Sequence, residues 1–123
     1  DSLDQYHSTA ATDFALQCGP RLLVDGQIPA KLRPGVSSRS ILAIRPDGEV
    51  IIAATQGLYL STEEIAQILQ RPEDKNGLAC WSALNLDGGS STQLYAKINH
   101  FQLSVPSFMP VADAVVILPR LNN

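Results

Sequence analysis

The sequence predicts an α+β domain in which a mostly antiparallel or mixed sheet packs against one clear helix. The first observation is a β-hairpin pattern, with apolar runs at residues 40–45 and 49–54 on either side of Pro46-Asp47-Gly48. The second is helical periodicity at about residues 61–71. The third is a set of short apolar runs, typical of strands, at residues 14–18, 21–24, 83–87, 92–98, 101–105 and 114–118.

Length and composition predict one globular domain, which we assign to residues 1–123. Hydrophobic residues make up 45% of the chain and charged residues 17%, the balance of a folded protein. The formal net charge of −3 argues against nucleic acid as a partner. No apolar run approaches the length of a transmembrane segment. The sequence starts at Asp1 without a methionine, so the absence of a signal peptide says nothing about compartment.

The predicted hairpin and helix also predict how the layers pack. Ile51-Ile52-Ala53-Ala54 is apolar at successive positions, which indicates a strand covered on both faces. Ser61 and Glu64 have the spacing of a capping box at the start of a helix. An apolar stripe follows at Ile65, Ile68 and Leu69, and the helix is expected to stop before Pro72. Residues 114–118 are expected to form a final buried strand.

The two cysteines leave two interpretations open. Cys18 and Cys80 do not form a metal-binding cluster, but they can either form one disulfide or remain as two buried thiols. Their separation in sequence does not determine their distance in the fold.

The segment from Ala83 to Thr92 is the strongest candidate for a functional site. If the strand continues to Asp87, its alternation places Asn85 and Asp87 on one face and two leucines on the other. Gly88-Gly89 permits a turn and a close backbone approach, and the hydroxyls of Ser90 and Ser91 follow. A carboxylate, an amide and hydroxyls at the end of a rigid strand are typical of a polar binding site. Asp-Gly is equally typical of a simple β-turn.

Five motifs in the same order carry a resemblance to a known family. They are Ala15–Pro20 followed by Leu23–Gly26, Ser38-Arg39-Ser40 before Ile44–Gly48, the helix starting at Ser61, the segment Ala83–Ser91, and Val105-Pro106-Ser107. Together they resemble the phosphodiester glycosidase family, whose hallmark is similar to Ala83–Ser91. The resemblance spans about residues 14–118 and corresponds to the later part of the family's domain.

The resemblance implies a hydrolase that cleaves a glycosidic or phosphodiester bond in a sugar-1-phosphodiester or related glycoconjugate. It also implies a secreted or periplasmic protein. Two departures suggest a subfamily with a different substrate. Many members carry a further residue between the paired glycines and the hydroxyls, whereas Ser90 follows Gly89 directly here. Many also carry an arginine after the Pro-Ser element, whereas residues 108–110 contain none.

The chemistry of such a substrate assigns expected roles to the site residues. Arg39 is expected to grip phosphate oxygens, since a guanidinium binds them in pairs and keeps its charge. Asp87 is expected to act as the acid or base. Substrate-binding roles are expected for the polar and glycine residues Asn85, Gly88, Gly89, Ser90, Ser91 and Ser107. The backbone N–H groups of residues 88–90, if turned inward, would add an anion-binding nest. A second carboxylate, usual in glycoside hydrolysis, is not placed by the sequence.

Structural roles compete with each of these assignments. Arg39 can be a surface cation, Asp87 can cap its own turn, and the serines can satisfy nearby amides. No metal site or cofactor is predicted; calcium or another divalent ion is compatible with the sequence, although no acidic loop resembles a dedicated site. A glycan-binding module without catalysis is an alternative function. A further alternative is an inactive fragment that needs its upstream half, and unpaired strand edges would then favour self-association or pairing with that half.

Overall fold

The computed structural model describes residues 15–119 and contains one four-stranded sheet and two small two-stranded ones. The larger sheet has the order β1 (Arg21–Leu23), β6 (Ser82–Asn85), β3 (Ser40–Ile44) and β4 (Val50–Ala54). β2 (Val36–Ser37) pairs with β5 (Leu60–Ser61), and β7 (Leu94–Ile98) pairs with β8 (Phe101–Val105). All of these pairings are antiparallel. With the helix α1 (Thr62–Gln70), they confirm the predicted α+β class.

The start of α1 confirms the predicted capping box. The Ser61 hydroxyl accepts a hydrogen bond from the Glu64 backbone N–H (3.1 Å), and the Glu64 carboxylate accepts one from the Ser61 N–H (2.8 Å). The bonds that Ser61 makes to the Glu64 carboxylate, the backbone one first, lower the pKa of Glu64. The helix stops at its C-cap, Arg71, directly before Pro72, which disfavours helical backbone in the residue ahead of it. A 3₁₀ turn, η2 (Glu73–Lys75), follows.

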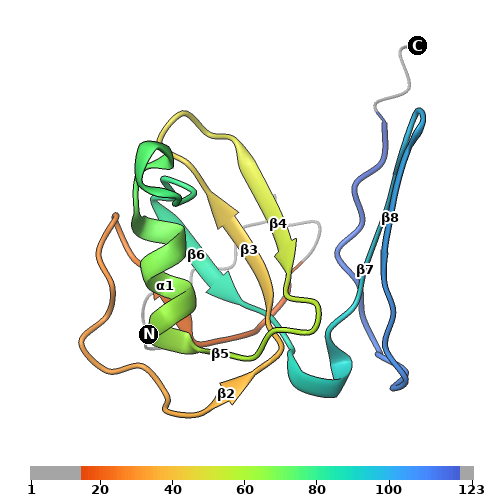
Figure 1. Ribbon diagram of the computed structural model, residues 1–123, viewed down its shortest axis with the longest axis horizontal. Helices are drawn as coiled ribbons and strands as arrows, with labels where there is room; N and C mark the ends of the chain where they lie inside the picture. The colour runs from red at the N-terminus through yellow and green to blue at the C-terminus, as the bar shows by residue number, and fades with distance from the viewer. Residues whose placement is uncertain (1–14, 120–123) are drawn as a thin grey trace.

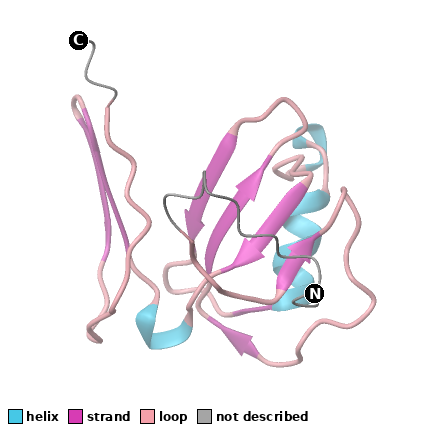
Figure 2. Ribbon diagram, turned by 180° about the vertical axis from the view of Figure 1, so that it is seen from behind, coloured by secondary structure: helices cyan, strands magenta, loops and turns pink. Residues whose placement is uncertain are grey.

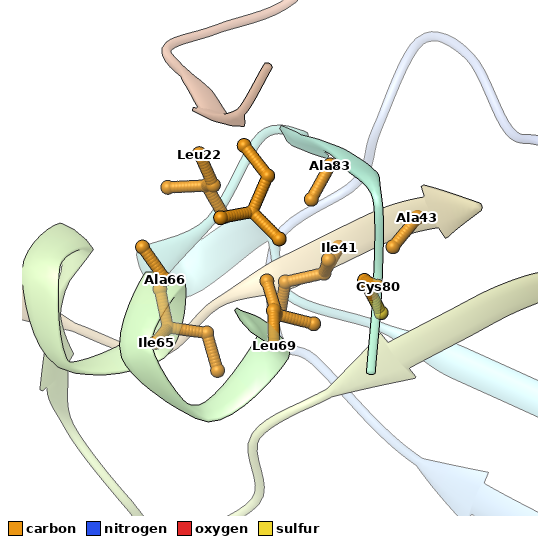
Figure 3. Close-up of a cluster of buried hydrophobic side chains, with 9 residues drawn as sticks. Leu22, Ile41, Ala43, Ile65, Ala66, Leu69, Cys80 and Ala83 are labelled. Atoms are coloured by element: carbon orange, nitrogen blue, oxygen red, sulfur yellow. The ribbon is translucent and has the colours of Figure 1, made fainter. Parts of the chain in front are cut away.

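The core lies between α1 and one face of the four-stranded sheet (Figure 1). Ile41 lies opposite Asn85 and Ala43 opposite Ala83 in the register of β3 and β6, so these four side chains share that face. Figure 3 shows the side chains of the helix and the sheet meeting there. The buried cluster consists of Leu22, Leu23, Ile41, Ala43, Ile65, Ala66, Leu69, Cys80 and Ala83.

The opposite face of the sheet is not covered by the described residues (Figure 2). Leu42 pairs with Ile52 and with Leu84 on this face, and Ile44 and Val50 are 45% and 53% exposed. The prediction that the strand at residues 51–54 is covered on both faces was therefore wrong, since Ile52 is 37% exposed on this face. An apolar run reports strand propensity and does not specify which neighbour is present to bury each face.

The β7–β8 hairpin stands beside the sheet rather than over it, and residues 106–119 return alongside the hairpin (Figures 1 and 2). The predicted strand at 114–118 was wrong, since this segment is irregular and exposed. Residues 15–18 are also not in a strand, and Phe14 lies outside the described residues. Both segments are apolar but have no ladder partner among the described residues, and strand structure requires one.

Cys18 and Cys80 are free thiols, so the structure excludes the disulfide, and the interpretation as a buried thiol is confirmed for Cys80. Cys80 is buried in the core, whereas Cys18 is half-buried. Burial raises the pKa of the Cys80 thiol, and the positive charge of Arg45 partly opposes this shift. Because the thiolate is the reactive form, Cys80 is a packing residue rather than a nucleophile.

Candidate functional site: a basic cavity beside the central strand

A cavity of about 320 Å³ lies where the end of β6, the start of α1 and the loop before β3 meet. Its walls bring together residues that are far apart in sequence. They come from residues 19–20, from the loop 33–37, and from Arg39, Thr62 and Asn85. Two of the residues expected in the site, Arg39 and Asn85, therefore line one cavity.

Arg39 is held by hydrogen bonds to residues of two other segments. Its N–H donates to the Thr55 hydroxyl (2.8 Å) and its carbonyl accepts from the Thr55 N–H (2.9 Å), which extends the β3–β4 pairing by one residue. The guanidinium donates through Nε to the Leu60 carbonyl and through Nη2 to the Gly35 carbonyl, both at 2.8 Å. A guanidinium has five N–H donors, so about three remain for a ligand after these two bonds to described residues.

Asn85 lines the same cavity and carries a buried acceptor. The residue is 6% exposed, and its Nδ2 donates to the carbonyls of Leu86 (2.7 Å) and Gly19 (3.4 Å). These two bonds fix the orientation of the amide, because the opposite orientation would place an oxygen against two carbonyls. Oδ1 is then buried without a donor from the described residues. An orphaned buried acceptor of this kind costs about 1–3 kcal/mol, which a ligand hydroxyl or N–H would offset.

The paired glycines allow the hallmark turn to pack against the segment that carries Arg39. A Cβ at Gly88 would come within 2.7 Å of the Ser38 carbonyl oxygen, so no side chain fits there. Gly89 has a φ of +62°, and its N–H donates to the same carbonyl (2.8 Å). That N–H is therefore used by the fold and does not contribute to an anion-binding nest. Both glycines act in this structure by holding Ser38 in place beside Arg39.

Asp87 lies outside the residues that line the cavity. β6 ends at Asn85, so the strand alternation that would have placed both side chains on one face does not continue to Asp87. Asn85 is buried and Asp87 is exposed. Asp87 lies in the turn between Asn85, which lines the cavity, and the glycines that contact Ser38.

The three serines of the expected site lie at the foot of the β7–β8 hairpin. Ser90 and Ser91 belong to the 3₁₀ turn η3 (Gly89–Ser91). The Ser107 hydroxyl donates to the Ser90 carbonyl and accepts from the Met109 N–H (3.1 Å). Ser107 thus joins the segment after β8 to the hallmark turn, and none of the three serines lines the cavity.

The sequence interpretation missed several cavity residues, among them Arg33 and Thr62. Arg33 lies in the loop between β1 and β2, where no periodicity marks a side chain as functional. Thr62 opens α1, and its hydroxyl donates to the Arg33 carbonyl (2.7 Å). The pairing of β2 with β5 brings this loop to the start of the helix, a long-range contact that no local pattern encodes.

Two other kinds of site were searched for among residues 15–119. No three His, Cys, Asp or Glu side chains gather there in a way that could hold a metal ion. No helix in the same range is long and apolar enough to cross a bilayer.

The fold and cavity define an α+β domain with an arginine and a buried amide at the end of a central strand. The sequence model of the phosphodiester glycosidase family matches residues 2–118. The chain therefore belongs to the phosphodiester glycosidase family, as its motifs predicted. No curated protein matches the sequence.

One solved structure is similar to part of the chain. It is described as the crystal structure of a hypothetical protein from Synechocystis, with 34% sequence identity and a TM-score of 0.50. The match covers 61% of this chain and 15% of the Synechocystis chain. The present chain thus corresponds to a small part of that relative's length.

Proposed function

We propose that this protein is a hydrolase that cleaves the glycosidic bond of a sugar-1-phosphodiester, with the cavity as its substrate site. Membership of the phosphodiester glycosidase family supports the reaction class. The observation that carries the proposal is the pairing of unlike groups in one cavity. Within the described range, Arg39 has guanidinium donors that are not used and a fixed positive charge, and Asn85 has a buried acceptor that lacks a donor.

This pairing fits a ligand with an anionic group and a hydroxyl. Arg39 is suited to the phosphate, because a guanidinium donates to two of its oxygens at once. The Asn85 Oδ1 cannot bind phosphate oxygens, which are acceptors themselves, but it can accept from a sugar hydroxyl. A site built around such a hydroxyl strongly rejects analogues that lack it.

Asp87 is the proposed acid/base of the reaction. Water adds to the anomeric carbon, the bond from that carbon to the phosphate oxygen breaks, and the products are the free sugar and a phosphomonoester. The Asp87 carboxylate, two residues after Asn85 in the sequence, would take the proton from the attacking water as a general base. We also propose a secreted or periplasmic location, on the ground of family membership.

The test is turnover of an N-acetylglucosamine-1-phosphodiester, measured as release of the free sugar. Asp87→Asn is expected to lower kcat by roughly 10²- to 10⁴-fold, the usual contribution of a general acid or base. Asp47→Asn is the matched control, since it removes the same charge from another exposed Asp-Gly turn. Unchanged turnover in Asp87→Asn would remove this carboxylate from the mechanism.

A glycan-binding module without catalysis is the second candidate. The observation that favours it is that no acidic side chain or histidine is among the described residues lining the cavity. Glycoside hydrolysis usually employs two carboxylates. Binding of sugar phosphates without release of free sugar, across a panel of sugar-1-phosphodiesters, would select this candidate over the hydrolase.

A further inference from the structure

We propose that Arg33 and Arg39 act together as a two-charge clamp that makes the cavity prefer a phosphomonoester dianion over a phosphodiester monoanion. This inference rests on the proposed function, because the preferred anion is then the product of the reaction. Its expected consequence is product inhibition: the phosphomonoester left after loss of the sugar is held more tightly than the diester substrate.

The charges around the cavity are positive. Arg33 and Arg39 both line it, and no carboxylate is among its described lining residues. Neither arginine forms an ion pair with another residue of 15–119, whereas Arg45 elsewhere on the surface pairs with Glu49 and Glu73. In a chain with a formal net charge of −3, two arginines at one cavity without acidic partners among residues 15–119 indicate an anionic ligand.

Arg33 is anchored through its backbone. Its side chain is exposed, but its backbone carbonyl accepts a 2.7 Å hydrogen bond from Thr62, the first residue of α1. Two residues further on, the Gly35 carbonyl accepts from the Arg39 guanidinium. The loop that carries Arg33 is thus tied both to the helix and to the other arginine, which holds the Arg33 backbone at the cavity wall.

The charge of the ligand then decides its affinity. A phosphodiester carries one negative charge, and a phosphomonoester carries close to two above its second pKa of about 6. The second charge adds attraction to both arginines, whereas the hydroxyl that binds Asn85 leaves with the sugar. The phosphate half of the site therefore binds the product better than it binds the same group in the substrate.

The experiment compares methyl phosphate with dimethyl phosphate by calorimetric titration of the 123-residue chain at pH 8 and low salt. The native protein is expected to bind methyl phosphate roughly fivefold more tightly or better, a modest factor because the clamp is partly exposed. Arg33→Gln is expected to reduce the ratio of the two affinities to roughly twofold, because Arg39 still attracts the second charge. Lys31→Gln removes a positive charge from the same loop but not from the cavity lining, and it is expected to keep the ratio.

Equal affinities in the native protein would overturn the inference, and so would an unchanged ratio in Arg33→Gln that is still folded by circular dichroism. Loss of the ratio in Lys31→Gln as well would overturn the specific role of Arg33. The proposed function fails separately. A preference for methyl phosphate without turnover of any sugar-1-phosphodiester would support the two-charge clamp and contradict the proposed hydrolase. Turnover without that preference would support the hydrolase and contradict the clamp.

Discussion

The sheet-and-helix body and the β7–β8 hairpin contain similarly apolar residues but bury them very differently. In the body, Leu22 and Leu69 are completely buried between the sheet and α1. In the hairpin, Tyr95 and Phe101 are 65% and 58% exposed, and Val105 is the one strand residue of β7 and β8 that is buried. Figures 1 and 2 show why, since no described helix lies over either face of the hairpin.

The same division separates the residues expected in the site. Arg39 and Asn85 belong to the body and line its cavity, whereas Ser90 and Ser107 bond to each other at the foot of the hairpin. The hallmark segment Ala83–Ser91 therefore has two structural roles. Its first half ends a buried strand at the cavity, and its second half connects the body to the hairpin. Substitutions in the two regions should therefore differ both in stability and in binding.

The largest expected difference is in core packing. Leu69→Ala should lower the free energy of unfolding by about 2–5 kcal/mol, because it opens a space under the last turn of α1. Leu103→Ala in β8 makes the same chemical change at a side chain that is 39% exposed, and it should cost less than about 1 kcal/mol. Urea denaturation of both variants measures the two values. Equal losses would contradict the distinction between body and hairpin.

The next difference concerns the polar residues of the site. Asn85→Asp should destabilise the body by about 1–3 kcal/mol at pH 8, because a carboxylate cannot donate to the carbonyls of Leu86 and Gly19. The loss should be smaller at low pH, where a protonated aspartic acid regains one donor. Denaturation at the two pH values measures this, and a loss that does not depend on pH would show that the two donated bonds are unimportant.

A smaller effect is expected at the start of α1. Ser61→Ala removes the N-cap and should cost about 1 kcal/mol. Because Ser61 lowers the pKa of Glu64 in the folded state, this carboxylate contributes stability that is present above its ordinary pKa of 4.5 and is lost as pH falls through the lowered pKa of the folded state. Thermal unfolding between pH 2 and 7 should therefore show a weaker acid destabilisation in Ser61→Ala. An identical pH profile would argue against the capping box in solution.

The smallest effect is expected at the foot of the hairpin. Ser107→Ala removes one bond to the Ser90 carbonyl and one from the Met109 N–H, both in exposed surroundings. The cost should stay within about 0.5–1.5 kcal/mol, the net worth of an ordinary hydrogen bond. Sugar phosphate affinity should be unchanged, because Ser107 does not line the cavity. A large loss of affinity measured by titration would show that the hairpin serine contacts the ligand directly.

Local signals predicted the fold of the body well. The turn at residues 46–48 and the capping box at Ser61 each specify structure within a few residues, and the β3–β4 hairpin and α1 formed where expected. The segment at 114–118 failed because its apolar character requires a neighbouring strand that no local pattern supplies. The prediction that the strand at residues 51–54 is covered on both faces was wrong for the same reason, because burial is decided by partners that are distant in sequence.

The candidate site could be predicted only where a motif marked it. Arg39 and Asn85 stood in recognisable segments, and both line the cavity. Arg33 and Thr62 did not, because the long-range pairing of β2 with β5 is what brings them together. The position of Asp87 depended on where β6 ended, and strand boundaries are set by tertiary hydrogen bonds that alternation alone does not reveal.

The most direct test of the account is a chemical-shift titration with N-acetylglucosamine 1-phosphate, followed at side-chain N–H signals. The account predicts that the Arg39 Nε–H and the Asn85 Nδ2 protons shift together with one dissociation constant, while amides at the foot of the hairpin stay in place. Shifts confined to residues 90–109, or an Asn85 signal that does not respond at saturating ligand, would contradict it.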